Sequence, residues 1–386
     1  MYVNIEQWLG AENKLGIDIW KGKYQFEGET FEEWIERVSH GNKEIAELIR
    51  NKRFLFGGRI LANRGLDEKG RKVTYSNCYV LPQVGDSIED IYKTCSDLAR
   101  TFSYGGGVGI DISKLRPKDS FVNNTARKTS GACSFMDTFS QVTETIGQNG
   151  RRGALMISID CTHPELLDFI EIKNDLDRVT KANISVRVTD DFMRAVVENK
   201  DWELYFKSEH EETKKTVKAK EVFRLLCKNN WNMAEPGILF WDRIENYNLL
   251  SKDEEFHYAG VNPCAEEPLP NGGSCLLGSF NLNAYVKDKK FNLEDRITLI
   301  YKVRDRIWSF VEQQIEYGQI IYKTILFNKD LIIIGILDIW SSERFVALFF
   351  GMNGISQIDN TLRILLKILC CHSQIVFETQ QPEHFV

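Results

Sequence analysis

Residues 154–188 read ALMISIDCTHPELLDFIEIKNDLDRVTKANISVRV. Two apolar stretches in this segment, 154–159 and 182–188, have the length and the branched side chains of buried strands. Between them, residues 164–172 have the spacing of a helix, with a proline in the first turn. A strand, a helix and a second strand in this order indicate a β-α-β unit whose strands run parallel.

The same alternation continues on both sides of this segment. Further strands are expected at 74–81 and 108–112, and helices at 88–102, 134–146, 192–198 and 221–231. Earlier in the chain, residues 31–50 have helical periodicity, with apolar side chains at Phe31, Trp34, Ile35, Val38, Ile45, Leu48 and Ile49. We therefore predict an α/β fold with a largely parallel sheet, preceded by a small helical region at 1–60.

The composition is that of an ordinary globular protein. Of 386 residues, 43% are hydrophobic and 27% charged, and the net charge is −6, which favours neither a nucleic acid nor a membrane as partner. The most apolar stretch, 331–337, is far shorter than the roughly 20 residues that span a bilayer. Nine cysteines without a secretory pattern indicate a cytoplasmic protein with free thiols. Because no C-x-x-C or H-E-x-x-H spacing occurs, no metal site is expected.

The strongest local motif is Asn262-Pro263-Cys264-Ala265-Glu266. In an extended segment, alternate side chains share one face, so an amide, a thiol and a carboxylate would converge there. Such a trio suits a polyol, because the amide bonds hydroxyl groups and the carboxylate accepts a proton.

Two more cysteines lie in strand-like segments. Cys275 follows a glycine pair within 272–277, and Cys78 lies within 76–80. The alternative for all three cysteines is that they are buried core residues, since free cysteine packs as a small hydrophobe. Composition and spacing leave this choice open.

Taken together, the motifs resemble the catalytic subunit of ribonucleotide reductase, most closely its adenosylcobalamin-dependent (class II) branch. The resemblance extends from about residue 15 to about residue 295 and rests on ordered blocks: Ser76-Asn77-Cys78, Tyr104–Asp111, Gly147–Ala154, Asn262–Pro270 and Gly273–Leu282. It implies that residues 61–300 form the first part of the family's ten-stranded α/β barrel, with the substrate and specificity sites.

The resemblance also implies roles for the motif residues. Cys264 would carry a thiyl radical that abstracts the 3′ hydrogen of a ribonucleotide, Glu266 would be the base for the 3′ hydroxyl, and Asn262 would bind the sugar hydroxyls. Cys78 and Cys275 would be the dithiol that supplies two electrons while the 2′ hydroxyl leaves as water.

A glycine run precedes the strand expected at 108–112. Counted from Gly105, the sixth residue is Ile110, so the dinucleotide-binding pattern G-x-G-x-x-G fails. By family position, Gly106 and Gly107 would line the substrate together with Ser76. The alternative is a plain tight turn.

The resemblance places an effector site at five residues. Asp86 and Arg116 would bind a deoxynucleoside triphosphate, while Gln148, Arg151 and Arg152 belong to a loop that passes effector identity to the substrate base. The alternatives are that Asp86 caps the helix after it and that the loop is a solvated basic turn.

The radical source is expected to be adenosylcobalamin, with a separate radical-generating subunit as the alternative. The resemblance further implies a ribonucleotide substrate, an external dithiol of the thioredoxin type as reductant, and a homodimer.

The end of the chain differs in composition from the rest. Residues 315–386 contain only 12 charged side chains but 14 isoleucines, and nothing of the family's second half is recognisable. We therefore expect an aberrant or divergent tail at 301–386 and a truncated, inactive chain. A deoxynucleotide-binding remnant and a fragment that does not fold alone remain alternatives.

Overall fold

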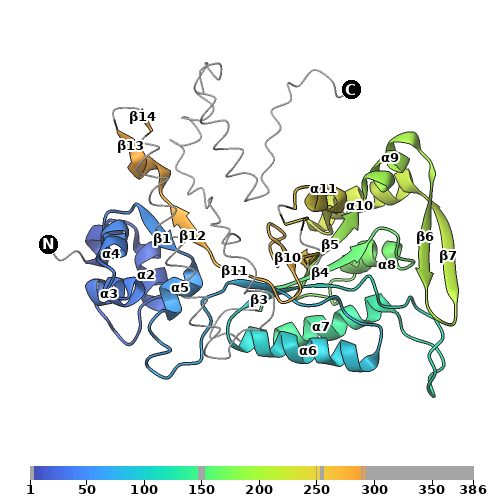
Figure 1. Cartoon of the computed structure of the whole chain (residues 1–386), viewed down its shortest axis with the longest axis horizontal. Coiled ribbons are helices and arrows are strands. Elements are labelled where there is room, and N and C mark those ends of the chain that lie inside the picture. The colour runs from blue at the N-terminus through green and yellow to red at the C-terminus, as the bar shows by residue number, and fades with distance from the viewer. Residues whose placement is uncertain (1–3, 147–152, 249, 253–255, 288–289, 292–386) are drawn as a thin grey trace. The chain divides into compact units, whose positions relative to one another are not determined.

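The computed structural model describes residues 4–146, 153–248, 250–252, 256–287 and 290–291 (Figure 1). These residues form two compact units, one of residues 4–69 with the described residues from 276 onward, the other within residues 70–275. The expected division into 1–60, 61–300 and 301–386 stays a prediction, and its third part lies outside the described residues.

The first unit is helical, as the periodicity of residues 31–50 indicates. Its helices are α1 (Ile5–Leu9), α2 (Lys14–Lys23), α3 (Phe31–Ser39), α4 (Lys43–Arg50) and α5 (Gly58–Asn63). The periodic segment is divided between α3 and α4, because His40 and Gly41 have φ values of 52° and 71° that end α3. Asn42 then caps α4 by accepting a hydrogen bond from Ile45 N at 3.1 Å. Every apolar side chain of the expected face is buried.

Short strands bring residues after 275 back to this unit. β1 (Phe54–Phe56) pairs antiparallel with β12 (Gly278–Phe280), and Phe54 lies opposite Phe280. The unit ends in the short elements η2 (Leu282–Tyr285), β13 (Val286–Lys287) and β14 (Lys290–Phe291). The segment after Cys275 therefore leaves the second unit and packs with the helices.

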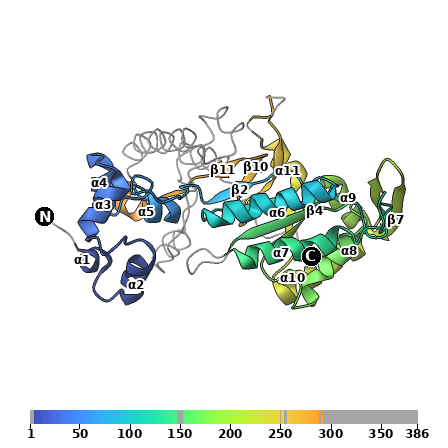
Figure 2. The same cartoon turned by 90° about the horizontal axis from the view of Figure 1, so that it is seen from below.

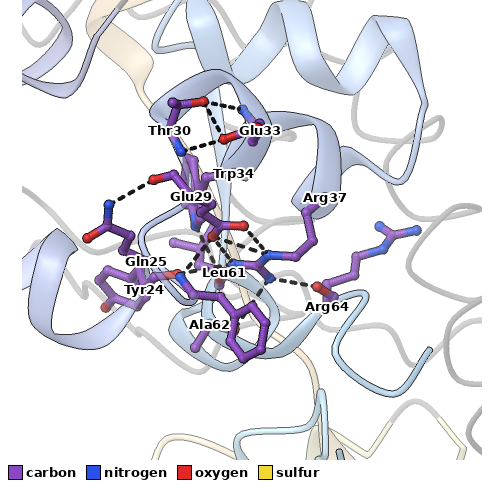
Figure 3. Close-up of polar contacts among 11 residues, drawn as sticks. Tyr24, Gln25, Glu29, Thr30, Glu33, Trp34, Arg37, Leu61, Ala62 and Arg64 are labelled. Atoms are coloured by element: carbon purple, nitrogen blue, oxygen red, sulfur yellow. Dashed lines mark hydrogen bonds and ion pairs between the residues drawn. The ribbon is translucent and has the colours of Figure 1, made fainter. Parts of the chain in front are cut away.

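Arg37, a nearly buried arginine of α3, connects this helix to neighbouring segments by an ion pair and hydrogen bonds (Figure 3). Arg37 Nη2 forms an ion pair with Glu29 Oε1 at 2.6 Å, and its side chain is only 8% exposed. The same guanidinium donates to the carbonyl oxygens of Arg64 at 2.6 Å and Tyr24 at 3.1 Å. One side chain thus joins α3, the loop before it and the end of α5.

The second unit is built on a six-stranded sheet in the order β11-β2-β3-β4-β5-β8. Its strands are β2 (Cys78–Val80), β3 (Gly107–Asp111), β4 (Leu155–Asp160), β5 (Asn183–Val188), β8 (Gly237–Phe240) and β11 (Ser274–Cys275). All neighbours from β2 to β8 pair parallel, whereas β11 pairs antiparallel with β2. The predicted β-α alternation and largely parallel sheet are confirmed. In the described part of the chain, this sheet is open.

Helices cover one face of the sheet, and Figure 2 shows α6 and α7 in front of the strands. The helices of the unit are α6 (Ile88–Ser103), α7 (Ala132–Thr145), α8 (Leu166–Glu171), η1 (Ile172–Asn174), α9 (Asp190–Glu198), α10 (Ala219–Met233) and α11 (Trp241–Asn246). Leu155, Ile157 and Ile159 of β4 pack into the main core with Phe102 and Phe139. Strand alternation then turns the residues between them to the opposite face.

That opposite face is covered by a hairpin of β9 (Tyr258–Val261) and β10 (Pro268–Pro270), together with α11. Met156 of β4 packs there against Val261 and Trp241. The central strand is therefore buried on both faces, as expected for parallel strands covered on two sides.

A separate antiparallel hairpin consists of β6 (Asp201–Lys207) and β7 (Glu212–Lys218) and includes most of the charged segment 209–220. Its side chains are mostly exposed along β7. Among the described residues, no helix is long and apolar enough to cross a membrane.

Candidate active site

The segment from Asn262 to Glu267 is a closed turn rather than the extended segment that the sequence predicts. Asn262 O accepts a hydrogen bond from Ala265 N at 3.0 Å, and Ala265 has φ of 67°. Asn262 Oδ1 accepts from Glu267 N at 3.0 Å and so closes the turn. The prediction that alternate side chains share a face is wrong here, because that rule holds only for extended backbone.

The turn separates the three motif side chains by exposure. Asn262 is fully buried, while Cys264 and Glu266 are exposed at the outer side of the turn. Nδ2 of Asn262 is buried without a hydrogen-bond partner in the described residues. The thiol and the carboxylate therefore face outward together, with a buried amide behind them.

The glycines of β3 let this turn approach the sheet closely. A Cβ atom on Gly109 would lie 1.7 Å from Val261 O, and one on Gly107 would lie 2.9 Å from Pro263 Cγ. Asn183 Nδ2 of β5 also donates to Pro263 O at 3.1 Å. The absence of side chains at Gly107 and Gly109 thus lets the chain's own hairpin approach β3 closely.

The neighbouring glycine has a different contact. A Cβ atom on Gly106 would lie 2.5 Å from Cε2 of Tyr79. Burial raises the pKa of the Tyr79 hydroxyl, which shares a 2.5 Å hydrogen bond with Thr74 Oγ1. A role of Gly106 and Gly107 in lining a substrate stays a prediction.

Two cysteines meet at the edge of the sheet. Cys275 of β11 is the register partner of Cys78 of β2, and both are buried free thiols. A hydrogen bond with Cys78, burial and the nearby carboxylates hold the pKa of the Cys275 thiol well above its usual range. Beside them, the buried Ser76 donates its hydroxyl hydrogen to Ser274 Oγ at 3.3 Å. The structure thus brings together the two thiols that lie far apart in the sequence.

The pKa of Cys264 depends on groups of the same site. Partial burial, the Glu266 carboxylate and Cys78 raise the pKa of the Cys264 thiol to about 11. Cys78 also contributes to the raised pKa of Cys275 and of Glu267. Three thiols and two carboxyl groups therefore interact electrostatically in one site.

Family comparison identifies this arrangement. The model of "Ribonucleotide reductase, barrel domain" matches residues 76–321 of the chain. The chain belongs to the ribonucleotide reductase family. The parallel sheet with the thiol-bearing hairpin on one face is the described part of that barrel domain, which confirms the predicted fold class.

Curated relatives agree with the ribonucleotide reductase assignment. A vitamin B12-dependent ribonucleoside-diphosphate reductase of Thermoplasma acidophilum is 35% identical over 289 residues, which cover 72% of this chain and 36% of the relative. The protein with that same description from Mycobacterium tuberculosis is 34% identical over 269 residues, 68% of this chain and 36% of the relative. The large subunit of a monkeypox virus ribonucleoside-diphosphate reductase is 25% identical over 306 residues, 68% of this chain and 38% of the relative. The chain thus spans little more than a third of the length of these reductases.

The two described effector candidates form an ion pair. Asp86 Oδ2 lies 2.7 Å from Arg116 Nε, and Asp86 Oδ1 accepts from Arg116 N at 2.9 Å. The N-cap of α6 is Ser87, which accepts from Asp90 N, so Asp86 is not the cap that the alternative proposed. Gln148, Arg151 and Arg152 lie outside the described residues.

One residue of the site was missed from the sequence. Glu267 follows the motif directly, is only 3% exposed, and has a buried Oε2 without a hydrogen-bond partner in the described residues. Burial, Glu266 and Cys78 raise its pKa well above the usual value. The available signal was a second glutamate directly after Glu266 in the sequence. In the same described part of the chain, no cluster of His, Cys, Asp or Glu suits a metal ion.

Proposed function

We propose that this chain carries the thiol chemistry of a ribonucleotide reductase, the reduction of a ribonucleoside diphosphate to its 2′-deoxy form. The observation that supports this most directly is the register pairing of Cys78 with Cys275 beside the turn that bears Cys264. A pair of adjacent thiols can supply two electrons and two protons and end as a disulfide. The printed descriptions of the relatives support the diphosphate as substrate.

The residues divide the reaction between them. Cys264, exposed on the turn, is the hydrogen-abstracting group at the 3′ carbon, and Glu266 beside it accepts the 3′ hydroxyl proton. The unpartnered Nδ2 of Asn262 is the donor assigned to a sugar hydroxyl. Cys78 and Cys275 supply two electrons and two protons and end as a disulfide. One proton leaves with the 2′ hydroxyl as water, a hydrogen takes its place on the 2′ carbon, and the hydrogen held by Cys264 returns to the 3′ carbon.

Adenosylcobalamin is the radical source that we propose, as the vitamin B12-dependent relatives support. When bound, it supplies the radical for the Cys264 thiol. The thiol of Cys264 is exposed and so is accessible to a bound cofactor, whereas a buried thiol would not be. We further propose a reductant of the thioredoxin type, a homodimer and a cytoplasmic location, where thiols stay reduced.

A chimeric enzyme tests the assignment. Residues 76–287 of this chain would replace the matching stretch of the Thermoplasma acidophilum relative, and deoxynucleotide formation would be measured with adenosylcobalamin and a dithiol. We expect the chimera to form deoxynucleotides and its Cys264→Ser variant to form none. The Cys275→Ser variant should not turn over when thioredoxin is the dithiol reductant. Wild-type turnover by the Cys264→Ser chimera would contradict the proposal. For the isolated chain we propose little or no turnover.

A second candidate function is effector binding without catalysis. The Asp86–Arg116 pair favours it, because its two members would suit a sugar hydroxyl and a phosphate. Equilibrium binding of deoxynucleoside triphosphates to the isolated chain separates this function from a chain that binds nothing.

A further inference from the structure

Glu267 immediately precedes β10 of the β9–β10 hairpin, and this hairpin packs on the two paired thiols through Leu269. Gly260 is opposite Leu269 in the antiparallel register, and the ladder continues through a hydrogen bond from Asn262 N to Glu267 O at 3.0 Å. Glu267 is two residues from Leu269 along the chain. Leu269 packs in one cluster with Cys78, Val80 and Cys275. The buried Glu267 therefore adjoins the strand that packs on the thiol pair, and Cys78 helps to raise the pKa of its carboxyl group.

The titratable groups around this carboxyl come from every neighbouring segment. Glu266 is on its own turn, Cys78 is on β2, Cys275 is on β11 and Tyr258 is on β9. None of them is a cation, and burial, Glu266 and Cys78 favour the protonated form of the carboxyl group. Oε2 is free to carry that proton, because no described residue bonds it.

We propose that Glu267 is the internal proton donor of the Cys78–Cys275 pair and delivers a proton to the Cys78 sulfur when the disulfide is reduced. The inference rests on the proposed function, which makes these two thiols a redox pair. It extends that function, because the radical-site roles use Cys264, Glu266 and Asn262 and leave Glu267 without a task.

The physical need for a donor follows from the environment of the thiols. The Cys275 pKa lies well above its usual value through burial and the hydrogen bond with Cys78, so a thiolate is disfavoured in this pair. A sulfur whose thiolate is disfavoured is a poor leaving group in thiol–disulfide exchange. A carboxylic acid beside it removes this obstacle by protonating the sulfur as the bond breaks.

The step balances with an external dithiol as co-reactant. Its thiolate attacks the sulfur of Cys275, the sulfur–sulfur bond breaks, and the electron pair goes to the sulfur of Cys78. The O–H bond of Glu267 breaks as the S–H bond of Cys78 forms. The second thiolate of the reductant then displaces Cys275 from the mixed disulfide. Glu267 and Cys275 take up the two protons that the reductant released, and the reductant ends as a disulfide.

The test uses the full chain and does not require reductase turnover. The chain is oxidised with diamide, the Cys78–Cys275 link is confirmed by peptide mapping, and reduction by dithiothreitol is followed by quenched alkylation from pH 6 to 9. Rates are divided by the concentration of dithiothreitol thiolate. We expect Glu267→Gln to lower this normalised rate by about tenfold or more. Glu245→Gln is the control, because Glu245 is partly buried and also has a raised pKa, but its charged neighbours include Arg187 and His257.

Wild-type measurements keep the inference testable if Glu267→Gln does not fold. The normalised wild-type rate should fall as pH rises through the Glu267 pKa, and it should be slower in heavy water. A flat normalised rate without an isotope effect, or a Glu267→Gln rate equal to that of wild type, overturns the inference and leaves the dithiol assignment intact. Failure of Cys78 and Cys275 to form a disulfide overturns both.

Discussion

Cys275 lies directly opposite Cys78 in the antiparallel register between β11 and β2. Side chains of directly opposed residues are close enough for a disulfide with small adjustments of the strands. We therefore expect mild oxidation of the full chain to link Cys78 to Cys275 before any other pair. Peptide mapping after diamide treatment measures this. Cys133 and Cys161 are the internal controls, because both are buried free thiols in the main core. A dominant link that involves either control would contradict the expectation.

The fit of the thiol-bearing turn against β3 should depend on Gly109. Replacement by alanine would place a Cβ atom 1.7 Å from Val261 O, so the hairpin must shift. Such overpacking costs about 1–3 kcal/mol of the free energy of unfolding. Denaturant unfolding measures the loss, and alkylation of Cys264 reports the displaced turn.

The control for this substitution is Gly22→Ala. Gly22 lies in α2, and nothing is within 4 Å of a Cβ atom at that position. Alanine has the higher helix propensity, so this variant should gain roughly 0.5–1 kcal/mol. Equal losses in Gly109→Ala and Gly22→Ala would show that the contact with Val261 is unimportant.

Most of the fold follows from local pattern in the sequence. The apolar stretch 154–159 is β4 almost residue for residue, and the helix expected at 88–102 is α6 with one more residue. These elements are predictable because burial on one or two faces determines their hydrophobic period.

The arrangement of the site depends on contacts that no local pattern contains. The antiparallel addition of β11 to β2 joins residues nearly 200 positions apart, as the Ser76–Ser274 hydrogen bond illustrates with a separation of 198. The turn after Asn262 arises from a side-chain cap and from space beside Gly109, so the extended segment predicted there is wrong. Resemblance to a family supplied the pairing of Cys78 with Cys275, and periodicity alone would have left them as core cysteines.

The Asp86–Arg116 pair should matter more for effector binding than for folding. Both side chains are partly exposed, at 26% and 22%, so Asp86→Asn should cost less than about 1 kcal/mol of unfolding free energy. Its affinity for a deoxynucleoside triphosphate should fall by about tenfold, since a charged hydrogen-bond acceptor is lost. Isothermal titration calorimetry measures the affinity. Asp191→Asn, in the exposed pair with Arg194, is the control and should leave both quantities unchanged. Unaltered affinity in Asp86→Asn would count against an effector site here.

Arg37 should be a principal stabiliser of the helical unit (Figure 3). Arg37→Ala leaves the Glu29 carboxylate, which is 10% exposed, without its ion-pair partner, and removes the donor from three carbonyl oxygens. Breaking a buried pair in this way costs about 3–5 kcal/mol. Denaturant unfolding of Arg37→Ala measures the loss, with Arg194→Ala as the exposed control near zero. A loss of less than about 1 kcal/mol for Arg37→Ala would contradict the buried-pair argument.

Cys264 should react with alkylating agents in a strongly pH-dependent way. Its pKa of about 11 means that only a small fraction is thiolate near pH 8, although the side chain is exposed. Because the thiolate is the nucleophile, the iodoacetamide rate should rise about tenfold per pH unit up to pH 10. The Glu266 carboxylate disfavours the thiolate, so Glu266→Gln should lower the Cys264 pKa and speed alkylation at a fixed pH. Mass spectrometry separates Cys264 from Cys227, the exposed thiol that serves as internal reference. Faster alkylation of Cys264 in wild type than in Glu266→Gln would reverse the assigned sign of this interaction.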